Sequence, residues 1–418
     1  MKTRAVRLYG RRDLRLEEFE LPPLRAGEVL ARLVCDGVCM STWKECEQGT
    51  AHKKVPPDIA TRPIIIGHEF AGEILEVGTR WKGRFTPGQR FAVQVAIRGG
   101  RIPGYAYPHV GGAATHIIVP EEVVEQDCLI PVELPAHYLA SLAEPLSCIV
   151  RAFEASYHVD PEDFSHRMGL RPGGRLALLG AGGPMGLCSL AFALALERRP
   201  SFIALGDRDP GRLRRAAALL PPERARAAGV ELKYIETPEG TAESRLRAAA
   251  GGAGYDDAFV FAPDAPLLEA AGQLLAHDGC LNFFAGPAHK DFAARLNFYD
   301  VHYSGLHVAG TSGGNAAHMR RALDIIAAGA VDPSLMITHV GGLDSVIATT
   351  LDLPAIPGGK KLIYTGMAMD LVALADLRAR AADDARYGAL AELVEARAGL
   401  WSPEAERCLL ESFGAEPA

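Results

Sequence analysis

The sequence predicts an α/β protein with a β-rich, barrel-like region and a doubly wound parallel sheet, and three observations support this prediction. Short apolar runs separated by Gly and Pro fill the chain up to residue 147. From residue 148 onward, strand-like segments alternate with helical ones, which is typical of a parallel sheet. The chain has 418 residues, of which 48% are hydrophobic and 23% charged, so it is globular and long enough for two cores.

The first region consists of strand-like segments between turn residues. Its candidate strands are AVRLYG, EVLARLVC, EFAGEILEVG, RFAVQVAI and ATHIIVP. Gly and Pro separate them, as in TPGQ at 86–89 and GGRIPG at 99–104. Alternating apolar residues bounded by such turns predict half-buried strands, so we expect this region to be mostly β.

The second region alternates between strands and helices. Its candidate strands are RLALLG, FIALGD, KYIE, DDAFVFA, GCLNFFAG and LHVAGT. The helices between them include PMGLCSLAFALALERR, which Pro200 ends, and DPGRLRRAAALL, which has Pro210 near its start. We expect the crossovers between the parallel strands to be right-handed.

An uncharged stretch at 176–196 reaches the length of a membrane span. Its middle is GAGGPMG, which contains four glycines and a proline. We therefore interpret the stretch as a buried strand, a glycine turn and a buried helix, and we expect no membrane partner. The N-terminus alternates charged and apolar residues without an apolar signal core, which predicts a cytoplasmic protein.

The C-terminal part returns to mixed character. It contains the helix AHMRRALDIIAAG and the strands MITHVGG and KKLIYTGM, followed by Ala-, Glu- and Arg-rich helical sequence that breaks at WSPE. We predict a first domain at 1–149 that is completed by 313–366, a second domain at 150–312, and a helical C-terminal extension at 367–418. The sequence leaves the role of the extension open.

Charge and cysteine content exclude two classes of protein. The net charge of −7 leaves no basic excess for a broad nucleic-acid surface, so we expect no nucleic-acid partner. The eight cysteines are spread along the chain without the tight framework of a small secreted domain. We therefore expect reduced thiols, of which one or two are candidate metal ligands.

The glycine turn GAGGPMG is the first candidate binding motif, because it follows a predicted strand and opens a predicted helix. Glycine lets the backbone turn sharply and approach a pyrophosphate, while the helix N-terminus offers free N–H groups. We assign dinucleotide binding to Gly180, Gly182, Gly183, Pro184 and Met185. The spacing is one residue longer than G-x-G-x-x-G, and a tight turn of any α/β protein is the alternative.

An acidic residue closes the next predicted strand. Asp207 ends FIALGD, where a carboxylate can bind the hydroxyls of the adenosine ribose. This position favours NAD(H) over NADP(H), because a carboxylate repels a 2′-phosphate. The neighbouring Arg208 weakens that preference, and we assign both residues to the cofactor site. A helix N-cap or a turn residue is the alternative role for Asp207.

A second constellation combines a thiol, an imidazole and two carboxylates. Cys39 precedes the GHE segment that contains His68 and Glu69, and Glu144 follows further along the chain. These residue types suit a catalytic zinc ion, which needs three protein ligands and one open position. No local spacing rule joins Cys39 to His68, and a lone cysteine is usually a small core residue.

At these residues the chain resembles the zinc-containing medium-chain alcohol and polyol dehydrogenases. The matching segments, in the family's order over residues 35–366, are VCMS, GHEFAGEILEVG, PGQRFAV, GGAATHIIVP, AEPLSC, GAGGPMG and GDRDPGRL. The resemblance implies a GroES-like β-barrel that carries zinc, a Rossmann domain that binds NAD(P)(H), and an active site between them. It also implies a small-molecule substrate and a homodimer or homotetramer.

The resemblance also assigns roles to single residues. It implies that Cys39 and His68 are zinc ligands and that Glu69 is an adjacent carboxylate that ligates the metal or exchanges with water. Glu144 matches a Glu-Pro position that serves as a ligand or near-ligand in the sorbitol and threonine dehydrogenase branch. Ser41 matches the hydroxyl that passes a proton to or from the substrate oxygen.

Two departures from the family pattern change these expectations. The family often carries four clustered cysteines for a structural zinc, and the matching segment IRGGRIPGYAYPHVGG has none. We therefore expect one catalytic zinc and no structural zinc. The family often has histidine five residues after the zinc cysteine, where this chain has Lys44. Lys44 puts the last step of the usual proton relay in doubt and is itself a candidate catalytic residue.

A narrower resemblance concerns the substrate. The segments CMSTWK, PIIIGHEF, PGGKKLIYTGM and GLWSPEAE resemble the branch that reduces a ketose phosphate to a hexitol phosphate, here L-sorbose 1-phosphate to D-glucitol 6-phosphate. A phosphate needs cationic partners, and Lys44, Lys53 and Lys54 are the candidates, although lysines are mostly just solvated. Free polyols or threonine are alternative substrates. A nucleotide-binding regulatory protein that has lost its chemistry is the non-enzymatic alternative.

Overall fold

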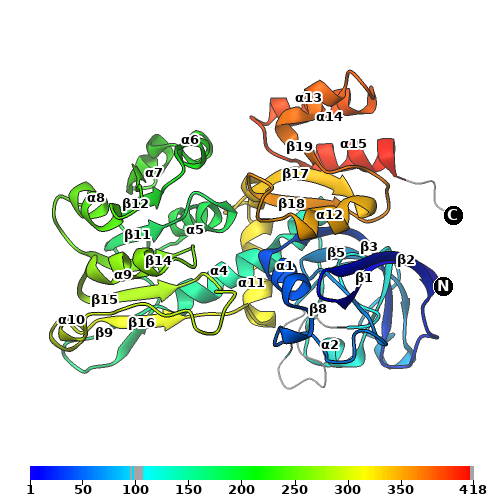
Figure 1. Cartoon of the computed structure of the whole chain (residues 1–418), viewed down its shortest axis with the longest axis horizontal. Coiled ribbons are helices and arrows are strands. Elements are labelled where there is room, and N and C mark those ends of the chain that lie inside the picture. The colour runs from blue at the N-terminus through cyan, green and yellow to red at the C-terminus, as the bar shows by residue number, and fades with distance from the viewer. Residues whose placement is uncertain (95–96, 98–106, 415–418) are drawn as a thin grey trace. The chain divides into compact units, whose positions relative to one another are not determined.

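The chain folds into two compact units in a computed structural model that describes residues 1–94, 97 and 107–414. Unit 1 comprises Met1–Pro145, Gly314–Ala327 and Ile337–Ala418, and unit 2 comprises Leu146–Gly313 and Ala328–Met336. Figure 1 shows the chain from its N-terminus in blue to its C-terminus in red. The first and last parts of the sequence therefore belong to the same unit.

Unit 1 is built on two sheets. Its strands are β1 (Lys2–Gly10), β2 (Asp13–Glu20), β3 (Val29–Val38), β4 (Ile64–Ile65), β5 (Phe70–Val77), β6 (Arg90–Val93), β7 (His116–Val119), β8 (Leu129–Pro131), β17 (Ile337–Gly342), β18 (Lys360–Tyr364) and β19 (Val372–Ala373). Strands β2, β1 and β4 form the smaller sheet. The larger sheet has the order β19-β17-β18-β3-β5-β6-β8, and β7 also pairs with β3. The late strands β17 to β19 thus extend a sheet that the N-terminal part of the chain begins.

The helices of unit 1 are mostly short. They are α1 (Met40–Gln48), α2 (Glu121–Glu125), α3 (His137–Ser141), α11 (Ala316–Ala327), α12 (Val346–Leu351), α13 (Leu377–Arg380), α14 (Arg386–Ala396) and α15 (Pro403–Phe413), with 3-10 turns η1 (Gly49–Ala51), η2 (Thr79–Trp81), η4 (Leu343–Ser345) and η5 (Leu374–Asp376). Helix α4 (Ala143–Ala155) begins in unit 1 and continues in unit 2. The core collects apolar side chains of the central strands, such as Val29, Leu33, Phe70 and Phe91.

Unit 2 is a six-stranded sheet with a small hairpin. The sheet strands are β11 (Arg175–Leu179), β12 (Phe202–Asp207), β13 (Glu231–Glu236), β14 (Tyr255–Val260), β15 (Leu275–Phe283) and β16 (His307–Gly310), and the hairpin is β9 (Tyr157–Val159) with β10 (His166–Met168). The order is β13-β12-β11-β14-β15-β16, and every neighbouring pair is parallel. This is the doubly wound order, whose switch point lies between β11 and β14.

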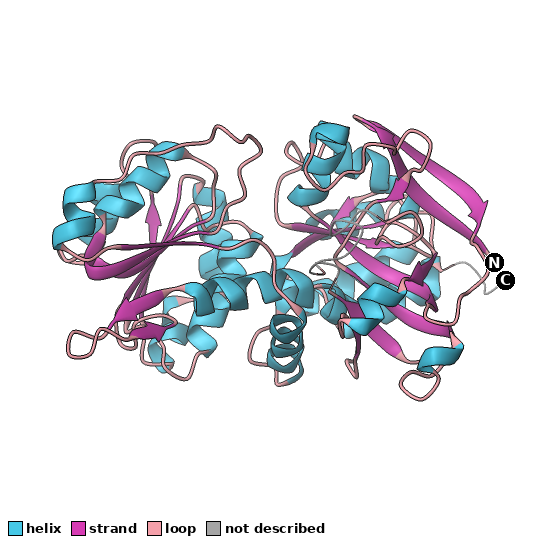
Figure 2. Ribbon diagram, turned by 90° about the horizontal axis from the view of Figure 1, so that it is seen from below, coloured by secondary structure: helices cyan, strands magenta, loops and turns pink. Residues whose placement is uncertain are grey.

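Helices cover both faces of this sheet, which Figure 2 shows nearly edge-on. They are α5 (Pro184–Ala195), α6 (Pro210–Leu219), α7 (Pro222–Ala227), α8 (Ala242–Ala249), α9 (Ala265–Gln273) and α10 (Phe298–Tyr303), with the turn η3 (Pro333–Met336). Strand β11 is buried except for its first residue, as expected for a strand covered on both faces. The predicted parallel sheet is confirmed.

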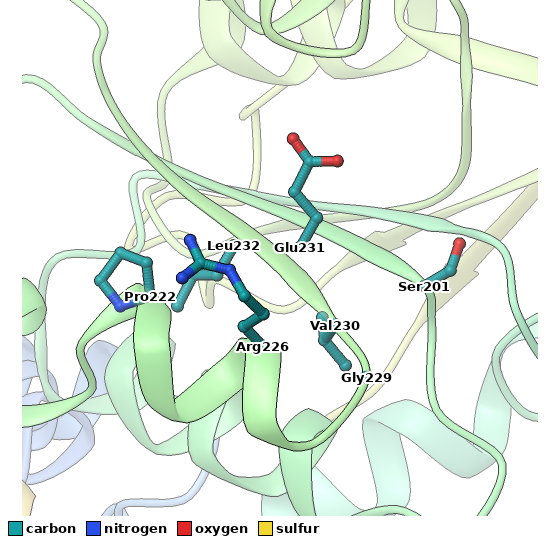
Figure 3. Close-up of a pocket in the computed structure, with 7 residues that line it drawn as sticks. All are labelled: Ser201, Pro222, Arg226, Gly229, Val230, Glu231 and Leu232. Atoms are coloured by element: carbon teal, nitrogen blue, oxygen red, sulfur yellow. The ribbon is translucent and has the colours of Figure 1, made fainter.

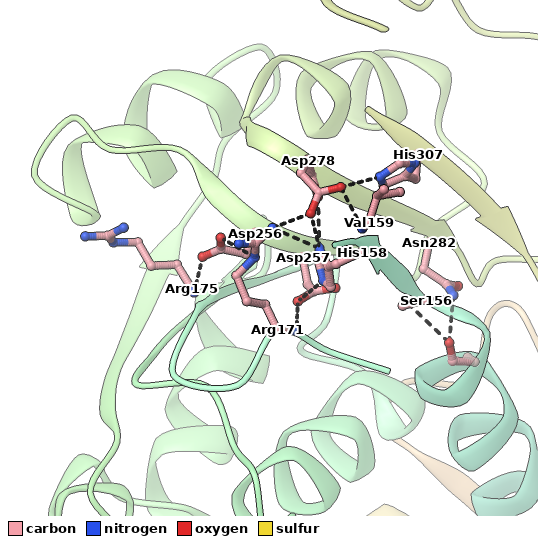
Figure 4. Close-up of polar contacts among 11 residues, drawn as sticks. Ser156, His158, Val159, Arg171, Arg175, Asp256, Asp257, Asp278, Asn282 and His307 are labelled. Carbon is pink, nitrogen blue, oxygen red and sulfur yellow. Dashed lines mark hydrogen bonds and ion pairs between the residues drawn. The ribbon is translucent and has the colours of Figure 1, made fainter. Parts of the chain in front are cut away.

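A network of polar side chains lies at the end of this sheet where the strands start (Figure 4). His158 Nε2 lies 3.2 Å from Asp257 Oδ1, near the start of β14, and the backbone N–H of Arg171 donates to Asp257 Oδ2 at 2.9 Å. His307 Nε2, at the start of β16, lies 2.6 Å from Asp278 Oδ1. These carboxylates have partners within unit 2, so we interpret the network as structural.

The predicted regions differ from the observed units at two places. Residues 328–336, expected to complete the first domain, belong to unit 2, because Arg215 Nη2 donates to the carbonyl of Leu335 at 2.8 Å. The extension at 367–418 is not a separate body, because its described residues pack into unit 1. The apolar stretch at 176–196 forms β11 and α5, and no helix among the described residues has the length and apolar character needed to cross a membrane.

Candidate metal and dinucleotide sites

Three of the predicted metal ligands converge in unit 1. The sulfur of Cys39, a ring nitrogen of His68 and a carboxylate oxygen of Glu69 lie within 4.8 Å of one another. Cys39 is the N-cap of α1 directly after β3, while His68 and Glu69 directly precede β5. Strands β3 and β5 are antiparallel neighbours with Asp36 opposite Phe70. Strand pairing therefore assembles a group that no local spacing rule could join.

Glu69 is paired with a cation that the sequence analysis missed. Lys360 Nζ forms an ion pair with Glu69 Oε1, and the two side chains are 7% and 1% exposed. Burial disfavours the charge, but the nearby Glu69 and Cys39 raise the pKa of Lys360 above its ordinary value. Lys360 opens β18, which runs antiparallel to β3 with Lys361 opposite Val38. A lysine in an apolar strand such as KKLIY must find a partner, and this was the available signal.

The group fits a zinc ion. Glu69 Oε2 is buried and has no hydrogen-bond partner among the described residues, which is costly for a carboxylate oxygen. Burial raises the pKa of Cys39 to about 12, although Lys360 opposes this shift. A divalent cation would satisfy the free oxygen and convert the thiol to thiolate. Thiolate, imidazole and carboxylate are the ligand types that zinc prefers.

Glu144, the fourth predicted ligand, lies in the first turn of α4 and is 3% exposed. Burial raises the pKa of its carboxyl, and Glu69 adds to this shift while His68 opposes it. These influences place Glu144 within electrostatic reach of the metal group. Glu144 does not belong to the group of Cys39, His68 and Glu69, whose ligand atoms all lie within 4.8 Å of one another. Its role as a ligand or near-ligand therefore stays a prediction.

Two polar side chains, those of Thr42 and Asp36, contact the candidate ligands His68 and Glu69. Thr42 Oγ1 lies 3.2 Å from His68 Nδ1, and Asp36 Oδ1 accepts a hydrogen bond from the backbone N–H of Glu69 at 3.0 Å. Partners of this kind fix the orientation and tautomer of a ligating histidine. Gly67, before His68, has φ +92°, and a Cβ there would collide with the carboxylate of Asp36. Thr42 was not predicted from the sequence, where the available signal was a hydroxyl three residues after Cys39.

Several basic residues lie on and after helix α1. Lys44 lies on α1, and His52, Lys53 and Lys54 follow η1. Burial, together with the positive charge of all three lysines, lowers the pKa of His52 to about 4. Burial also lowers the pKa of Lys54, while acidic neighbours that include Glu144 raise it. The three lysines therefore act electrostatically on His52, which was not predicted.

The two residues predicted to handle the proton both lie on α1. Ser41 is half-buried, two residues after Cys39, and its backbone N–H interacts with the Cys39 thiol. Lys44 follows three residues later, on the adjacent turn of the helix. Burial lowers the pKa of Lys44, whereas Cys39 raises it.

The glycine turn of unit 2 joins β11 to α5. Gly180 has φ +63°, a conformation that L side chains rarely adopt. Gly183 is the N-cap of α5, Pro184 is its first residue, and Met185 follows half-buried. This arrangement leaves the first N–H groups of the helix available at the switch point of the sheet, where a pyrophosphate binds in doubly wound folds.

Asp207 supports the turn from the neighbouring strand. Its Oδ2 accepts from the backbone N–H of Gly182 at 2.7 Å, and its Oδ1 accepts from that of Asp209 at 2.9 Å. The N-cap of α6 is Asp209, so the alternative that Asp207 caps this helix is wrong. The hydrogen bonds of Asp207 to backbone N–H groups are those of a turn residue. Arg208 is exposed. Arg212, which was not predicted, packs closely against Gly182, because a Cβ added to this glycine would lie 2.7 Å from the Cβ of Arg212.

Two hollows in unit 2 lie away from the glycine turn. The first has a volume of about 320 Å³ and is lined by residues that include Ser201, Arg226 and Glu231 (Figure 3). Ser201 precedes β12 and Glu231 opens β13, so this hollow lies where these two parallel strands start. Asp207 lies at the opposite end of β12. The second hollow shares Ser201 and Glu231. Neither has the position expected for a dinucleotide.

Two expectations about cysteine and metal have different outcomes. All eight cysteines lie in the described part of the chain, and all are free thiols. The segment expected to lack a structural zinc runs from 97 to 112, and its residues 98–106 lie outside the described residues. The absence of a structural zinc therefore stays a prediction.

Comparison with known proteins shows similarity in sequence and in fold. Residues 25–130 match the alcohol dehydrogenase GroES-like domain. The chain is 47% identical to L-sorbose 1-phosphate reductase of Klebsiella pneumoniae over 98% of its length and 97% of the relative. It is 41% identical to mannitol-1-phosphate 5-dehydrogenase of Aliivibrio fischeri over 99% of its length and 98% of the relative.

A solved structure shares the fold. It is a zinc-binding dehydrogenase from Sinorhizobium meliloti bound to NADP, which superposes with a TM-score of 0.69 at 19% sequence identity. The superposition covers 87% of this chain and 99% of that one. The shared fold thus accounts for nearly all of the solved protein, while part of the present chain has no counterpart in it.

Proposed function

Because this chain belongs to the zinc-containing medium-chain alcohol and polyol dehydrogenases, we propose that it reduces the ketone carbon of a ketose phosphate with a nicotinamide dinucleotide. The proposed reaction converts L-sorbose 1-phosphate to D-glucitol 6-phosphate. One observation carries the proposal: the chain is 47% identical to L-sorbose 1-phosphate reductase over nearly its full length, and it brings Cys39, His68 and Glu69 together in one group.

In this proposal Cys39, His68 and Glu69 hold one zinc ion, with Glu144 as a ligand or near-ligand. When bound, the ion supplies a Lewis acid that polarises the carbonyl and stabilises negative charge on its oxygen. Lys360 compensates the charge of the Glu69 carboxylate in a buried environment. The chain contributes a ligand set that is arranged before the substrate arrives.

The proton for the substrate oxygen comes from Ser41 in this mechanism. A serine hydroxyl must recover the proton that it gives away, and Lys44 lies on the adjacent turn of the same helix. Burial lowers the pKa of Lys44, which makes its ammonium a better proton donor. We propose Lys44 as the residue that takes the place of the histidine at the end of the family's relay.

The substrate phosphate is assigned to the basic cluster. Lys44 interacts electrostatically with Cys39, and Lys54 interacts with Cys39 and Glu144, while all three lysines act on His52. Two relatives that the chain matches over nearly their full length, L-sorbose 1-phosphate reductase and mannitol-1-phosphate 5-dehydrogenase, are named for phosphorylated compounds. We therefore favour a phosphorylated substrate over a free polyol or threonine.

The dinucleotide is assigned to residues 180–186 and the end of β12. The bound nicotinamide supplies the hydride, and the residues of the glycine turn hold the pyrophosphate that positions it. The carboxylate of Asp207 favours NAD(H), because it would repel a 2′-phosphate. Arg208 and Arg212 are the cations that an NADP(H)-preferring enzyme would use, so measured Kd values for the two cofactors decide this point.

The experiment that tests the proposed function combines metal analysis with turnover. We expect about one zinc ion per chain and oxidation of NADH with L-sorbose 1-phosphate at a kcat/KM well above those for L-sorbose, fructose and the threonine-derived ketone. Preference for an unphosphorylated substrate would refute the phosphate assignment. A protein that binds a dinucleotide without zinc or turnover would support the regulatory alternative.

Lys44→Ala separates the two roles of that residue. If Lys44 binds the phosphate, the preference for sorbose 1-phosphate over sorbose falls; if it serves only the proton relay, kcat falls for both substrates alike. The homo-oligomeric state and the cytoplasmic location remain predictions, and analytical ultracentrifugation tests the first.

A further inference from the structure

The last helix of the C-terminal extension carries a buried carboxylate. Glu406, on α15, is 3% exposed. Its Oε1 accepts from the backbone N–H of His137 at 2.6 Å and lies 3.3 Å from the Nδ1 of that residue. Its Oε2 accepts from the backbone N–H of Tyr138 and from the hydroxyl of Tyr364, both at 2.9 Å. Every one of these partners lies outside the extension, on α3 or β18.

The contacts on α3 lead toward Glu69 and Glu144. Ser141, the last residue of α3, donates its hydroxyl to the backbone carbonyl of Glu69 at 2.5 Å. Glu144 follows three residues later in the first turn of α4. Because α3 is short and begins at the carboxylate of Glu406, a displacement at its start would reach both Glu69 and Glu144.

The contact on β18 leads to Glu69 by a second route. Tyr364 ends β18, and Lys360, which is ion-paired with Glu69, begins it. The hydroxyl of Tyr364 accepts from Nε1 of the fully buried Trp401 at 2.8 Å and donates to Glu406. The extension therefore binds the strand that carries Lys360 through two of its own side chains. Figure 1 shows α13, α14 and α15, in orange and red, beside β17 to β19.

We propose that the C-terminal extension is a positioning element for the metal ligands and that Glu406 is the positioning residue through which it acts. The contacts of its carboxylate join the extension to α3 and β18 and are not needed to form the helix that carries it. The inference rests on the proposed function only in taking Cys39, His68 and Glu69 as metal ligands. It does not depend on which substrate is reduced.

Glu406→Gln in the full chain tests this proposal. The substitution keeps the size of the side chain but replaces one acceptor oxygen with an NH₂ group that faces backbone N–H groups. We expect the zinc affinity, measured by competition with a chromophoric chelator, to fall about 10- to 100-fold, as for other partners that hold metal ligands. The visible absorption bands of the Co²⁺-substituted protein should shift. The Kd for NADH should stay unchanged, because the residues assigned to it lie in unit 2.

Tyr364→Phe is a second, milder variant that removes the hydroxyl through which both Glu406 and Trp401 contact β18, and it leaves the contacts of Glu406 with α3 in place. We expect it to shift the Co²⁺ bands in the same direction with a smaller loss of zinc affinity. If Glu406→Gln does not fold, this variant decides the question with the same two measurements.

Two matched variants separate positioning from stability. Glu411→Gln changes an exposed glutamate on the same helix and should leave the melting temperature, zinc affinity and Co²⁺ spectrum unchanged. Val394→Ala removes buried apolar volume from α14 and should lower the melting temperature without changing the metal measurements. If Glu406→Gln and Tyr364→Phe behave like Val394→Ala, the extension serves stability alone and the proposal is overturned.

The proposed function can fail without affecting this test. A parent protein that binds zinc normally but does not reduce a ketose phosphate would contradict the proposed substrate. The zinc affinities and Co²⁺ spectra of the variants would still confirm or refute the role of Glu406.

Discussion

Replacing Lys360 with methionine should destabilise the metal-free protein far more than the zinc-bound protein. The change leaves the carboxylate of Glu69, 1% exposed, without its ion-pair partner. Breaking a buried ion pair by removing one partner costs about 3–5 kcal/mol, because the other charge stays buried. Zinc bound to the same carboxylate supplies the missing positive charge, so we expect a loss of about 1 kcal/mol or less in saturating zinc.

The assay is urea denaturation followed by tryptophan fluorescence, with chelator and with zinc. All three tryptophans, Trp43, Trp81 and Trp401, belong to unit 1, so their emission reports the unfolding of that unit. Lys361→Met is the matched control, since this buried lysine donates to three backbone carbonyls and its loss should be independent of zinc.

A double-mutant cycle completes the test. In a Glu69→Gln background no buried negative charge remains at that position, so Lys360→Met should cost clearly less than in the parent protein. Equal losses with and without zinc, or additive effects of the two substitutions, would refute the reasoning.

Three further changes test the sites and the packing behind them. Thr42→Val removes the hydroxyl beside His68 Nδ1, and we expect zinc affinity, measured by chelator competition, to fall about 10-fold or more with an unchanged Kd for NADH. Asp207→Ala should raise the Kd for NADH and lower the free energy of unfolding by about 1–3 kcal/mol, because two backbone N–H groups lose their acceptor. Asp209→Ala removes only the N-cap of α6, so it should lower the free energy of unfolding by about 1 kcal/mol and leave the Kd unchanged. Burial lowers the pKa of His137, but the carboxylates of Glu406 and Glu73 outweigh this effect and raise the pKa above 6.5. The protonated His137 therefore stabilises the folded protein fully below about pH 6.5, and this stabilisation is lost as the pH rises through the pKa of the folded state. The melting temperature of His137→Gln should therefore fall further below that of the parent at about pH 6 than at about pH 9, and an equal difference at both would contradict this assignment.

Local motifs made the two-domain fold and several site residues predictable from the sequence. The glycine turn requires a positive φ at Gly180 and a helix start at Pro184, and both requirements act between neighbours in the chain. The GHE segment likewise depends on the backbone of Gly67, which has φ +92°. Alternating strands and helices predicted the parallel sheet for the same reason, since period and punctuation are local properties.

The partners of these residues could not be derived in this way. Lys360 and Glu69 are 291 positions apart, and Glu406 and His137 are 269 apart. Their contacts arise because β18 pairs with β3 and because α15 packs against α3, and no periodicity in the sequence encodes either pairing. The low polarity of the interior then makes each buried charge depend on its partner.

From the sequence one could therefore predict which residues are candidates for the chemistry, from residue type and family resemblance. The backbone conformations that the motifs need could also be predicted, because they depend on immediate neighbours. The folded chain alone established that Lys360 neutralises Glu69, that Thr42 faces His68 and that Glu406 joins the extension to α3 and β18. The reason is physical: burial and charge compensation act through space, and only the folded chain fixes those distances.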